Sequence, residues 1–170
     1  MMPEAEKTGR NGASELRIVA FEPAHANAFR DLNLEWIEAF FAVEELDRRH
    51  LYFPRESFVD SGGAILMAQM GGATIGCCGL LKHDDGVYEV SKMAVKREYQ
   101  GSGIGTRLLR EIIAYARRLG ARRLEIISST RLATAIRLYK QMGFVEVPLE
   151  SDAYARGNIA LTLEMADTAT

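Results

Sequence analysis

The chain has 170 residues, of which 48% are hydrophobic and 26% charged, as expected for one globular domain. The 21 Lys and Arg nearly balance the 23 Asp and Glu, which leaves a formal charge of −2. This balance argues against nucleic-acid or anionic-membrane binding, since both favour a strongly basic surface. No run approaches the roughly 20 apolar residues that span a bilayer. The polar start of the chain does not resemble a secretory signal, so we expect a cytoplasmic protein.

The cysteine and histidine content gives no sign of a disulfide or a metal site. The two cysteines, Cys77 and Cys78, are adjacent, and adjacent cysteines very rarely pair. The three histidines are scattered, so no zinc-ligand spacing occurs. The sequence therefore predicts neither a disulfide framework nor a bound metal.

The first third of the chain predicts one strand and two helices. Residues 1–14 are polar and without periodicity, which indicates a mobile tail before a single domain over residues 15–170. The apolar run at residues 16–21 predicts a strand. Residues 24–51 carry apolar side chains at spacings of three and four, and an interruption near Val43 indicates two helices.

Three strands of a meander are predicted next. Residues 64–70 and 73–81 are apolar runs joined by Gly71 and Gly72, a pair typical of a two-residue hairpin turn. A second turn leads into a third strand at residues 87–95. These segments predict neighbouring antiparallel strands.

The remaining elements follow a glycine-rich loop at residues 100–106. The pattern predicts a long amphipathic helix after the loop, a strand at residues 123–128 and a helix at residues 133–142. Two final strands are predicted at residues 144–147 and 158–165. The order is strand, two helices, three strands, helix, strand, helix, two strands, which predicts a mixed α/β (α+β) sheet flanked by helices.

The loop from Gln100 to Thr106 is the sharpest local feature. Unpaired N–H groups in the first turn of a helix attract anions, and glycines let the backbone approach a phosphate closely. A plain turn with glycines for tightness is the alternative. Thr106 and Arg107 stand where a P-loop needs Lys and Ser or Thr, and Thr106 replaces the third glycine of the dinucleotide fingerprint. Both of those nucleotide sites are therefore disfavoured.

Three segments together resemble the GNAT superfamily of N-acetyltransferases. They are residues 88–95, the glycine loop with residues 107–110 after it, and residues 135–144. The resemblance implies a mostly antiparallel mixed sheet and direct transfer of an acetyl or short acyl group from acetyl-CoA to a primary amine, in a ternary complex. It implies a small-molecule or peptide amine as acceptor and, by analogy, a homodimer. A non-catalytic CoA-binding sensor or interaction module of the same fold is the alternative.

The resemblance also implies the cofactor contacts. In the family, the diphosphate rests on the backbone of the glycine loop, here Gln100, Gly101, Ser102, Gly103, Ile104, Gly105 and Thr106. The pantetheine arm pairs with exposed strand backbone, here Met93, Ala94 and Val95, where one N–H polarises the thioester carbonyl. Many relatives place an Asn against this arm, and this sequence has Leu132 instead. Three polar residues just upstream could supply the lost contacts: Ser128, Ser129 and Thr130.

Two side chains are catalytic candidates by the same resemblance. Tyr139 occupies the position of a Tyr that protonates the departing thiolate, which requires the site to strengthen the phenol as an acid. Its alternative role is packing on the sheet. Glu89 corresponds to an acid that accepts the proton of the amine, often through water. Alternatively, Glu89 faces solvent or pairs with Lys82 or Lys92.

In this superfamily the first two helices and the last hairpin shape the acceptor pocket. Four aromatic residues offer an apolar wall: Trp36, Phe40, Phe41 and Tyr52. Three acids could attract a cationic amine, although a solvated helix face explains them as well: Glu44, Glu45 and Asp47. Four residues near the last hairpin could close the pocket: Asp152, Tyr154, Arg156 and Asn158.

Overall fold

One seven-stranded sheet organises the computed structural model, which describes residues 15–166. The predicted tail, residues 1–14, lies outside the described residues. The strands are β1 Leu16–Ala20, β2 Ala64–Met70, β3 Ala73–Lys82, β4 Val87–Val95, β5 Arg123–Ser128, β6 Val145–Val147 and β7 Ile159–Glu164. The α-helices are α1 Ala26–Phe40, α2 Glu45–Tyr52, α3 Ile104–Arg118 and α4 Ala133–Gln141. The predicted order of elements and the mixed α/β class are confirmed.

The spatial order of the strands is β1-β2-β3-β4-β5-β7-β6. Every neighbouring pair is antiparallel except β4 and β5, which are parallel. The predicted β2–β3 hairpin turns at Gly71 and Gly72, whose φ angles of 57° and 80° are those of a turn that glycine adopts readily. Met70 therefore pairs directly with Ala73.

Three short helical segments were not predicted from the sequence. They are the 3₁₀ helices Pro23–His25 and Arg97–Tyr99 and the π-helix Arg55–Val59. Each spans no more than five residues, too few to produce a periodic apolar pattern. The π-helix extends the helical region past residue 51, where the predicted helices end.

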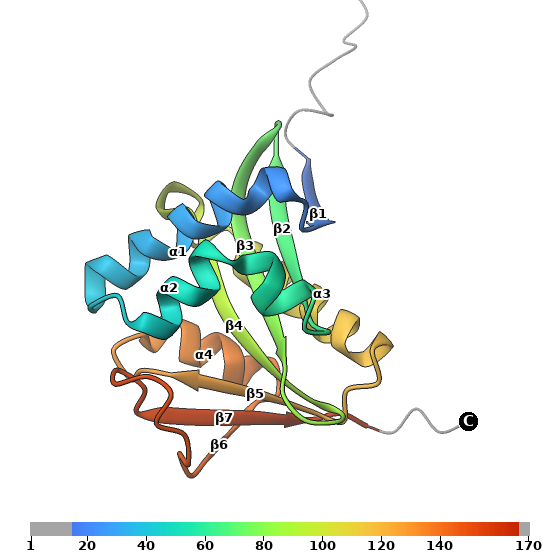
Figure 1. Cartoon of the computed structure of the whole chain (residues 1–170), viewed down its shortest axis with the longest axis vertical. Coiled ribbons are helices and arrows are strands. Elements are labelled where there is room, and N and C mark those ends of the chain that lie inside the picture. The colour runs from blue at the N-terminus through green and yellow to red at the C-terminus, as the bar shows by residue number, and fades with distance from the viewer. Residues whose placement is uncertain (1–14, 167–170) are drawn as a thin grey trace, which may run out of the picture.

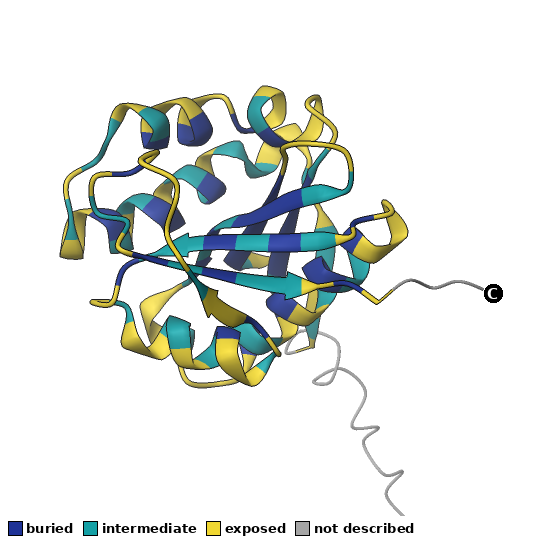
Figure 2. Ribbon diagram, turned by 90° about the horizontal axis from the view of Figure 1, so that it is seen from below, coloured by how far each residue is buried: buried dark blue, intermediate teal, exposed yellow. Residues whose placement is uncertain are grey.

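Helices cover both faces of the sheet. Helices α1 and α2 lie in front of the sheet in Figure 1, and α3 lies behind it. Two hydrophobic cores result, one beneath α3 and α4 and one beneath α1, α2 and the π-helix. Figure 2 shows buried residues along the central strands, while the outward faces of the helices are exposed.

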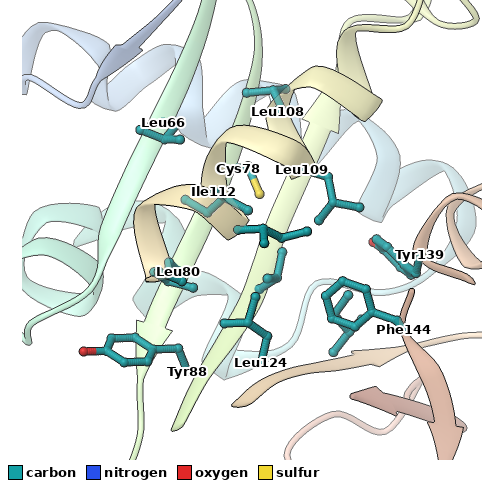
Figure 3. Close-up of a cluster of buried hydrophobic side chains, with 14 of the residues drawn as sticks. Leu66, Cys78, Leu80, Tyr88, Leu108, Leu109, Ile112, Leu124, Tyr139 and Phe144 are labelled. Carbon is teal, nitrogen blue, oxygen red and sulfur yellow. The ribbon is translucent and has the colours of Figure 1, made fainter. Parts of the chain in front are cut away.

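The core beneath α3 explains how α4 is held. Leu108, Leu109 and Ile112 of α3 are fully buried against the sheet, as the amphipathic pattern predicted. Figure 3 shows Tyr139 and Phe144 side by side at one edge of this cluster, with ring centroids 6.1 Å apart. The aromatic pair therefore anchors the last turn of α4 to the core.

Strands β4 and β5 separate soon after they pair. Their register ends at the third pair, Glu89 with Glu125, and the two strands then diverge in Figure 1. A β-bulge follows in β4, where the register with β3 shifts between Cys77 and Gly79. Lys92 lies at this bulge with φ 57°, the only positive φ of a non-glycine residue between residues 15 and 166. The edge of β4 beyond Glu89 thus lacks a strand partner on the β5 side.

Candidate active site

A cavity of about 680 Å³ opens where β4 and β5 separate. The glycine loop and the first turn of α3 line part of it. The free edge of β4, the end of β5 and helix α4 form its walls. Trp36 and Phe40 of α1, together with Tyr154 and Arg156 of the β6–β7 connection, line the remainder. The cavity is thus bounded by elements from most of the chain.

The glycine loop presents backbone donors to this cavity. Gly103 is the N-cap of α3 with φ 87°, and no side chain caps the helix. The first N–H groups of α3, from Ile104 to Thr106, have no acceptor within the helix. A Cβ at Gly101 or Gly103 would meet nothing within 4 Å, so glycine is needed there for its positive φ and not for space. This uncapped helix end fits an anionic group such as a diphosphate.

One predicted loop residue is placed differently from its neighbours. Ser102 does not line the cavity, because its hydroxyl donates a hydrogen bond back to the Tyr99 carbonyl. The other predicted loop residues all line the cavity: Gln100, Gly101, Gly103, Ile104, Gly105 and Thr106. The side chain of Ser102 stabilises the turn, so only its backbone is available to a ligand.

The predicted pantetheine strand borders the cavity as expected. Met93, Ala94 and Val95 all line it. The side-chain amide of Gln100 donates to the Val95 carbonyl at 3.0 Å, which ties the glycine loop to the end of β4. Backbone groups of this segment on the β5 side have no strand partner. The arrangement fits a ligand that hydrogen-bonds as an extra strand.

The β5–α4 connection shows how Leu132 is accommodated. Leu132 is the N-cap of α4, without a side-chain cap, and lines the cavity together with Ser128 and Ser129. Thr130 instead forms two hydrogen bonds with Asn158, at 2.8 and 3.0 Å. Of the three polar residues proposed to compensate for the absent Asn, two therefore border the cavity.

Tyr139 lies between the core and the cavity. Its ring packs on Phe144, and its side chain also lines the cavity, so packing and access to a ligand coexist. Burial raises the pKa of the Tyr139 phenol. The condition that the site strengthens the phenol as an acid is therefore not met in the protein alone, because no charged group offsets the effect of burial.

Glu89 is buried but does not line the cavity. Its Oε1 lies 2.8 Å from Nε2 of His83, and this hydrogen bond raises the pKa of His83. Neither Lys82 nor Lys92, the two partners considered from the sequence, forms the ion pair. The His83 side chain is 43% exposed, so it connects the buried carboxylate with solvent.

The sequence analysis missed a buried ionic network at the bulge of β4. Lys92 Nζ lies 2.9 Å from Oδ1 of Asp47 and donates to the Tyr154 hydroxyl at 3.1 Å. Both terminal nitrogens of Arg156 contact the same carboxylate, at 2.6 and 2.7 Å, and Glu44 accepts a further bond at 3.1 Å. The network joins α2, β4 and the β6–β7 connection on the α1/α2 side of the sheet.

Electrostatics within this network follow from its geometry. Burial alone would raise the pKa of Asp47, but hydrogen bonds from Arg156 and the charge of Lys92 outweigh it and hold the pKa well below its usual range. Burial lowers the pKa of Lys92 despite the carboxylate beside it. Burial, with the charge of Lys92, lowers the pKa of His50 to about 4, so His50 is neutral at pH 7. A lysine within a mostly apolar strand was the signal available in the sequence.

These contacts revise the sequence-based picture of the acceptor pocket. Asp47 and Glu44 face Lys92 and Arg156, so they are not free to attract a cationic amine. Glu45 lies outside the cavity. Of the other residues proposed for the pocket, four do not line the cavity: Phe41, Tyr52, Asp152 and Asn158.

Within residues 15–166, no group of three or more His, Cys, Asp or Glu side chains is arranged to hold a metal ion. No described helix combines the length and apolar character required to traverse a bilayer. The adjacent Cys77 and Cys78 are buried free thiols.

Comparison with known proteins places this geometry in a family. The model of the acetyltransferase (GNAT) family matches residues 28–144. The chain belongs to the GNAT family. An uncharacterized N-acetyltransferase of Mycobacterium bovis is 30% identical over 125 residues, which cover 74% of this chain and 70% of that protein.

Solved GNAT structures share the fold at low identity. An acetyltransferase of Staphylococcus aureus superposes with a TM-score of 0.80 at 18% identity, covering 88% of this chain and 99% of the other. The yncA protein of Salmonella typhimurium, solved with its cofactor acetyl-CoA, gives 0.69 at 23% identity and covers 92% and 98%. The predicted GNAT fold is therefore confirmed, and a CoA-type cosubstrate agrees with these neighbours.

Proposed function

We propose that this GNAT protein is an N-acetyltransferase that transfers an acetyl or other short acyl group from acetyl-CoA to a primary amine of a small molecule or peptide. The main observation that supports the proposal is the cavity. It connects the uncapped N-terminus of α3, the free edge of β4 and the Tyr139 side chain in one continuous space. Family membership and the neighbour solved with acetyl-CoA support the same donor.

In this proposal, the backbone binds the donor. The N–H groups at the start of α3 hold the diphosphate, with Gln100 to Thr106 wrapped around it. The pantetheine arm follows β4 along Met93, Ala94 and Val95, which lack a partner strand on that side. Such binding uses main-chain groups that are fixed by the fold before the ligand arrives, and it orients the thioester toward the acceptor.

The reaction is a direct acyl transfer in a ternary complex. The neutral amine nitrogen attacks the thioester carbonyl carbon, and the new C–N bond replaces the C–S bond. A backbone N–H of the Met93–Val95 segment donates to the carbonyl oxygen, which carries the developing negative charge. The nitrogen gives up one proton, and the sulfur leaves as a thiolate that gains one.

Tyr139 is proposed to protonate this thiolate. The raised pKa of Tyr139 keeps the phenol protonated at neutral pH, so the side chain carries the proton that it donates. Burial raises the pKa of a thiol in the same way: it brings that of Cys77 to about 12. A thiolate that leaves beside buried groups is therefore a stronger base than in water, which offsets the raised pKa of the phenol.

Glu89 is proposed to accept the proton of the amine. It does not line the cavity, so a water must relay the proton to it. His83, hydrogen-bonded to Glu89 and partly exposed, then offers an exit to solvent. The pair would connect a buried acceptor of protons with bulk water.

Calorimetry with acetyl-CoA and with free CoA tests the donor site, and thiol release from acetyl-CoA across an amine panel tests the enzyme. We expect binding of both CoA forms and amine-dependent thiol release. Binding without any amine-dependent release would favour the alternative, a non-catalytic CoA-binding module. Absence of binding by either CoA form would refute the donor site.

Substitutions separate the two proposed roles. Tyr139→Phe should lower kcat by about a hundredfold or more and leave the Kd for acetyl-CoA unchanged. Tyr88→Phe is the matched control, because Tyr88 is buried in the same core but does not line the cavity. Glu89→Gln should also lower kcat, whereas full turnover would reduce Glu89 to a partner of His83.

A further inference from the structure

The charged side chains that line the cavity share one sign. Among the described residues around it they are Lys92, Arg131, Arg137 and Arg156, and no Asp or Glu lines the cavity. Arg137 lies on α4 next to Leu138. Because the Leu138 side chain reaches Gly105, we assign Arg137 to the glycine-loop end of the cavity. The other three cations surround the part bounded by α1 and the β6–β7 connection. This is the part that remains for the acceptor.

The charges of two of these three cations, Lys92 and Arg156, are already balanced by carboxylates. Asp47 contacts both Lys92 and Arg156, and Glu44 contacts Arg156. Both carboxylates lie outside the cavity lining. The charges of Lys92 and Arg156 are therefore largely balanced within the protein.

Arg131 is different because no carboxylate within residues 15–166 pairs with it. Its guanidinium donates to the carbonyl oxygen of Phe40, and it lies 5.0 Å from the ring centroid of Phe41. The guanidinium of Arg156 lies 5.6 Å from the same ring. Arg131 is exposed, and its contacts with α1 place it beside the aromatic wall formed by Trp36 and Phe40. One positive charge at the acceptor end is thus available to a ligand.

We propose that the acceptor is a primary amine that also carries a carboxylate, as in a free amino acid, and that Arg131 binds this carboxylate. The inference rests on the proposed acetyltransferase function. A guanidinium presents paired donors that match a carboxylate, and such charge-assisted bonds are stronger than neutral ones. The uncompensated charge of Arg131 serves the chemistry as well. Nearby positive charge disfavours an ammonium and so favours the neutral amine that attacks the thioester.

A polyamine or a basic peptide would bind weakly at the same site. Each brings positive charge toward Arg131, whose charge no carboxylate within residues 15–166 balances, and carries no carboxylate to compensate. An amino acid is neutral overall, because its carboxylate balances its ammonium. Its side chain would contact Trp36 and Phe40.

The test measures thiol release from acetyl-CoA with each of the common amino acids, each corresponding amino acid amide, spermidine and a short peptide blocked at its C-terminus. We expect the preferred amino acid to exceed its amide in kcat/KM by about tenfold or more, the factor that one charge-assisted hydrogen bond supplies. In Arg131→Gln this ratio should fall toward one through a higher acceptor KM, with the Kd for acetyl-CoA unchanged. Arg117→Gln, an exposed substitution on α3 outside the cavity, is the control and should retain the ratio.

Each contrary result has a distinct meaning. Preference for the amides, spermidine or the blocked peptide refutes the carboxylate inference and leaves the acetyltransferase proposal intact. The inference also fails if Arg131→Gln keeps the acid-to-amide ratio, or if it weakens acetyl-CoA binding instead, which would make Arg131 a contact of the donor. Absence of thiol release with every acceptor refutes both proposals together.

Discussion

Replacement of Asp47 by Asn removes a carboxylate that two cations share inside the protein. Asp47 is fully buried, Lys92 Nζ lies 2.9 Å from it, and the Lys92 side chain is only 2% exposed. Removing one partner of a buried pair costs about 3–5 kcal/mol. We expect about 3 kcal/mol, the lower end of that range, because burial already lowers the pKa of Lys92 and its amine can release the proton. In a domain of this size, such a loss lowers Tm by roughly 6–12 °C.

Thermal unfolding followed by circular dichroism at pH 7 measures this loss. The pKa of Asp47 in the folded protein lies below its usual value, so its contribution to stability is present above the unfolded pKa of about 3.9 and is lost as the pH falls. The difference in unfolding free energy between wild type and Asp47→Asn should therefore shrink between about pH 5 and pH 3.

Two further variants make the test decisive. Asp31→Asn is the exposed control: its ion pair with Arg30 is on the surface, and the change should stay within about 0.5 kcal/mol. Adding Lys92→Met to Asp47→Asn should recover part of the lost stability, because no uncompensated ammonium remains. A fall in Tm below about 2 °C for Asp47→Asn, or a double variant no more stable than the single one, would refute this account of the network.

Three other predictions concern separate parts of the molecule. Gly103→Ala should lose about 1–2 kcal/mol of stability, because Gly103 has a positive φ. Gly105→Ala should not lose stability, because the new Cβ would lie an ordinary 3.6 Å from its nearest neighbour. Equal denaturation midpoints for the two variants would contradict this prediction. The raised pKa of His83 beside Glu89 stabilises the fold below about pH 6.5, the pKa of an unperturbed His, and the benefit fades as the pH rises. Wild type and His83→Gln should therefore differ more in unfolding free energy at pH 5.5 than at pH 8.5, and a constant difference would count against the pair. Both cysteine thiols should resist Ellman's reagent until denaturant is added, and rapid labelling of folded protein would show that they are not buried.

Local sequence patterns were sufficient for most of the fold. The Gly71-Gly72 pair predicted the β2–β3 hairpin, because a two-residue turn with positive φ at both positions leaves few other arrangements. The apolar stripe of α3 predicted which face is buried. The single-turn helices escaped prediction, since three to five residues do not establish a period.

The candidate site likewise has one part that local sequence indicated and one part that it did not. The proposed anion-binding end lies within one contiguous loop and the helix after it, so residues 100–106 were sufficient to indicate it. The acids near residue 45 gave a misleading signal, because the sequence shows that Asp47 is acidic but not which cations it faces. Lys92 lies 45 residues away from Asp47 and Arg156 lies 109 residues away.

The sequence by itself thus determined the strands, the longer helices and their order, and it indicated a candidate phosphate-binding loop, because these depend on contacts between residues a few positions apart. Only the tertiary structure decided the separation of β4 and β5, the bulge at Lys92 and the sign of the charged residues that line the cavity. Those features arise where distant segments pack together. Burial there forces each charged group to find a partner, and the choice of partner determines which charges remain for a ligand.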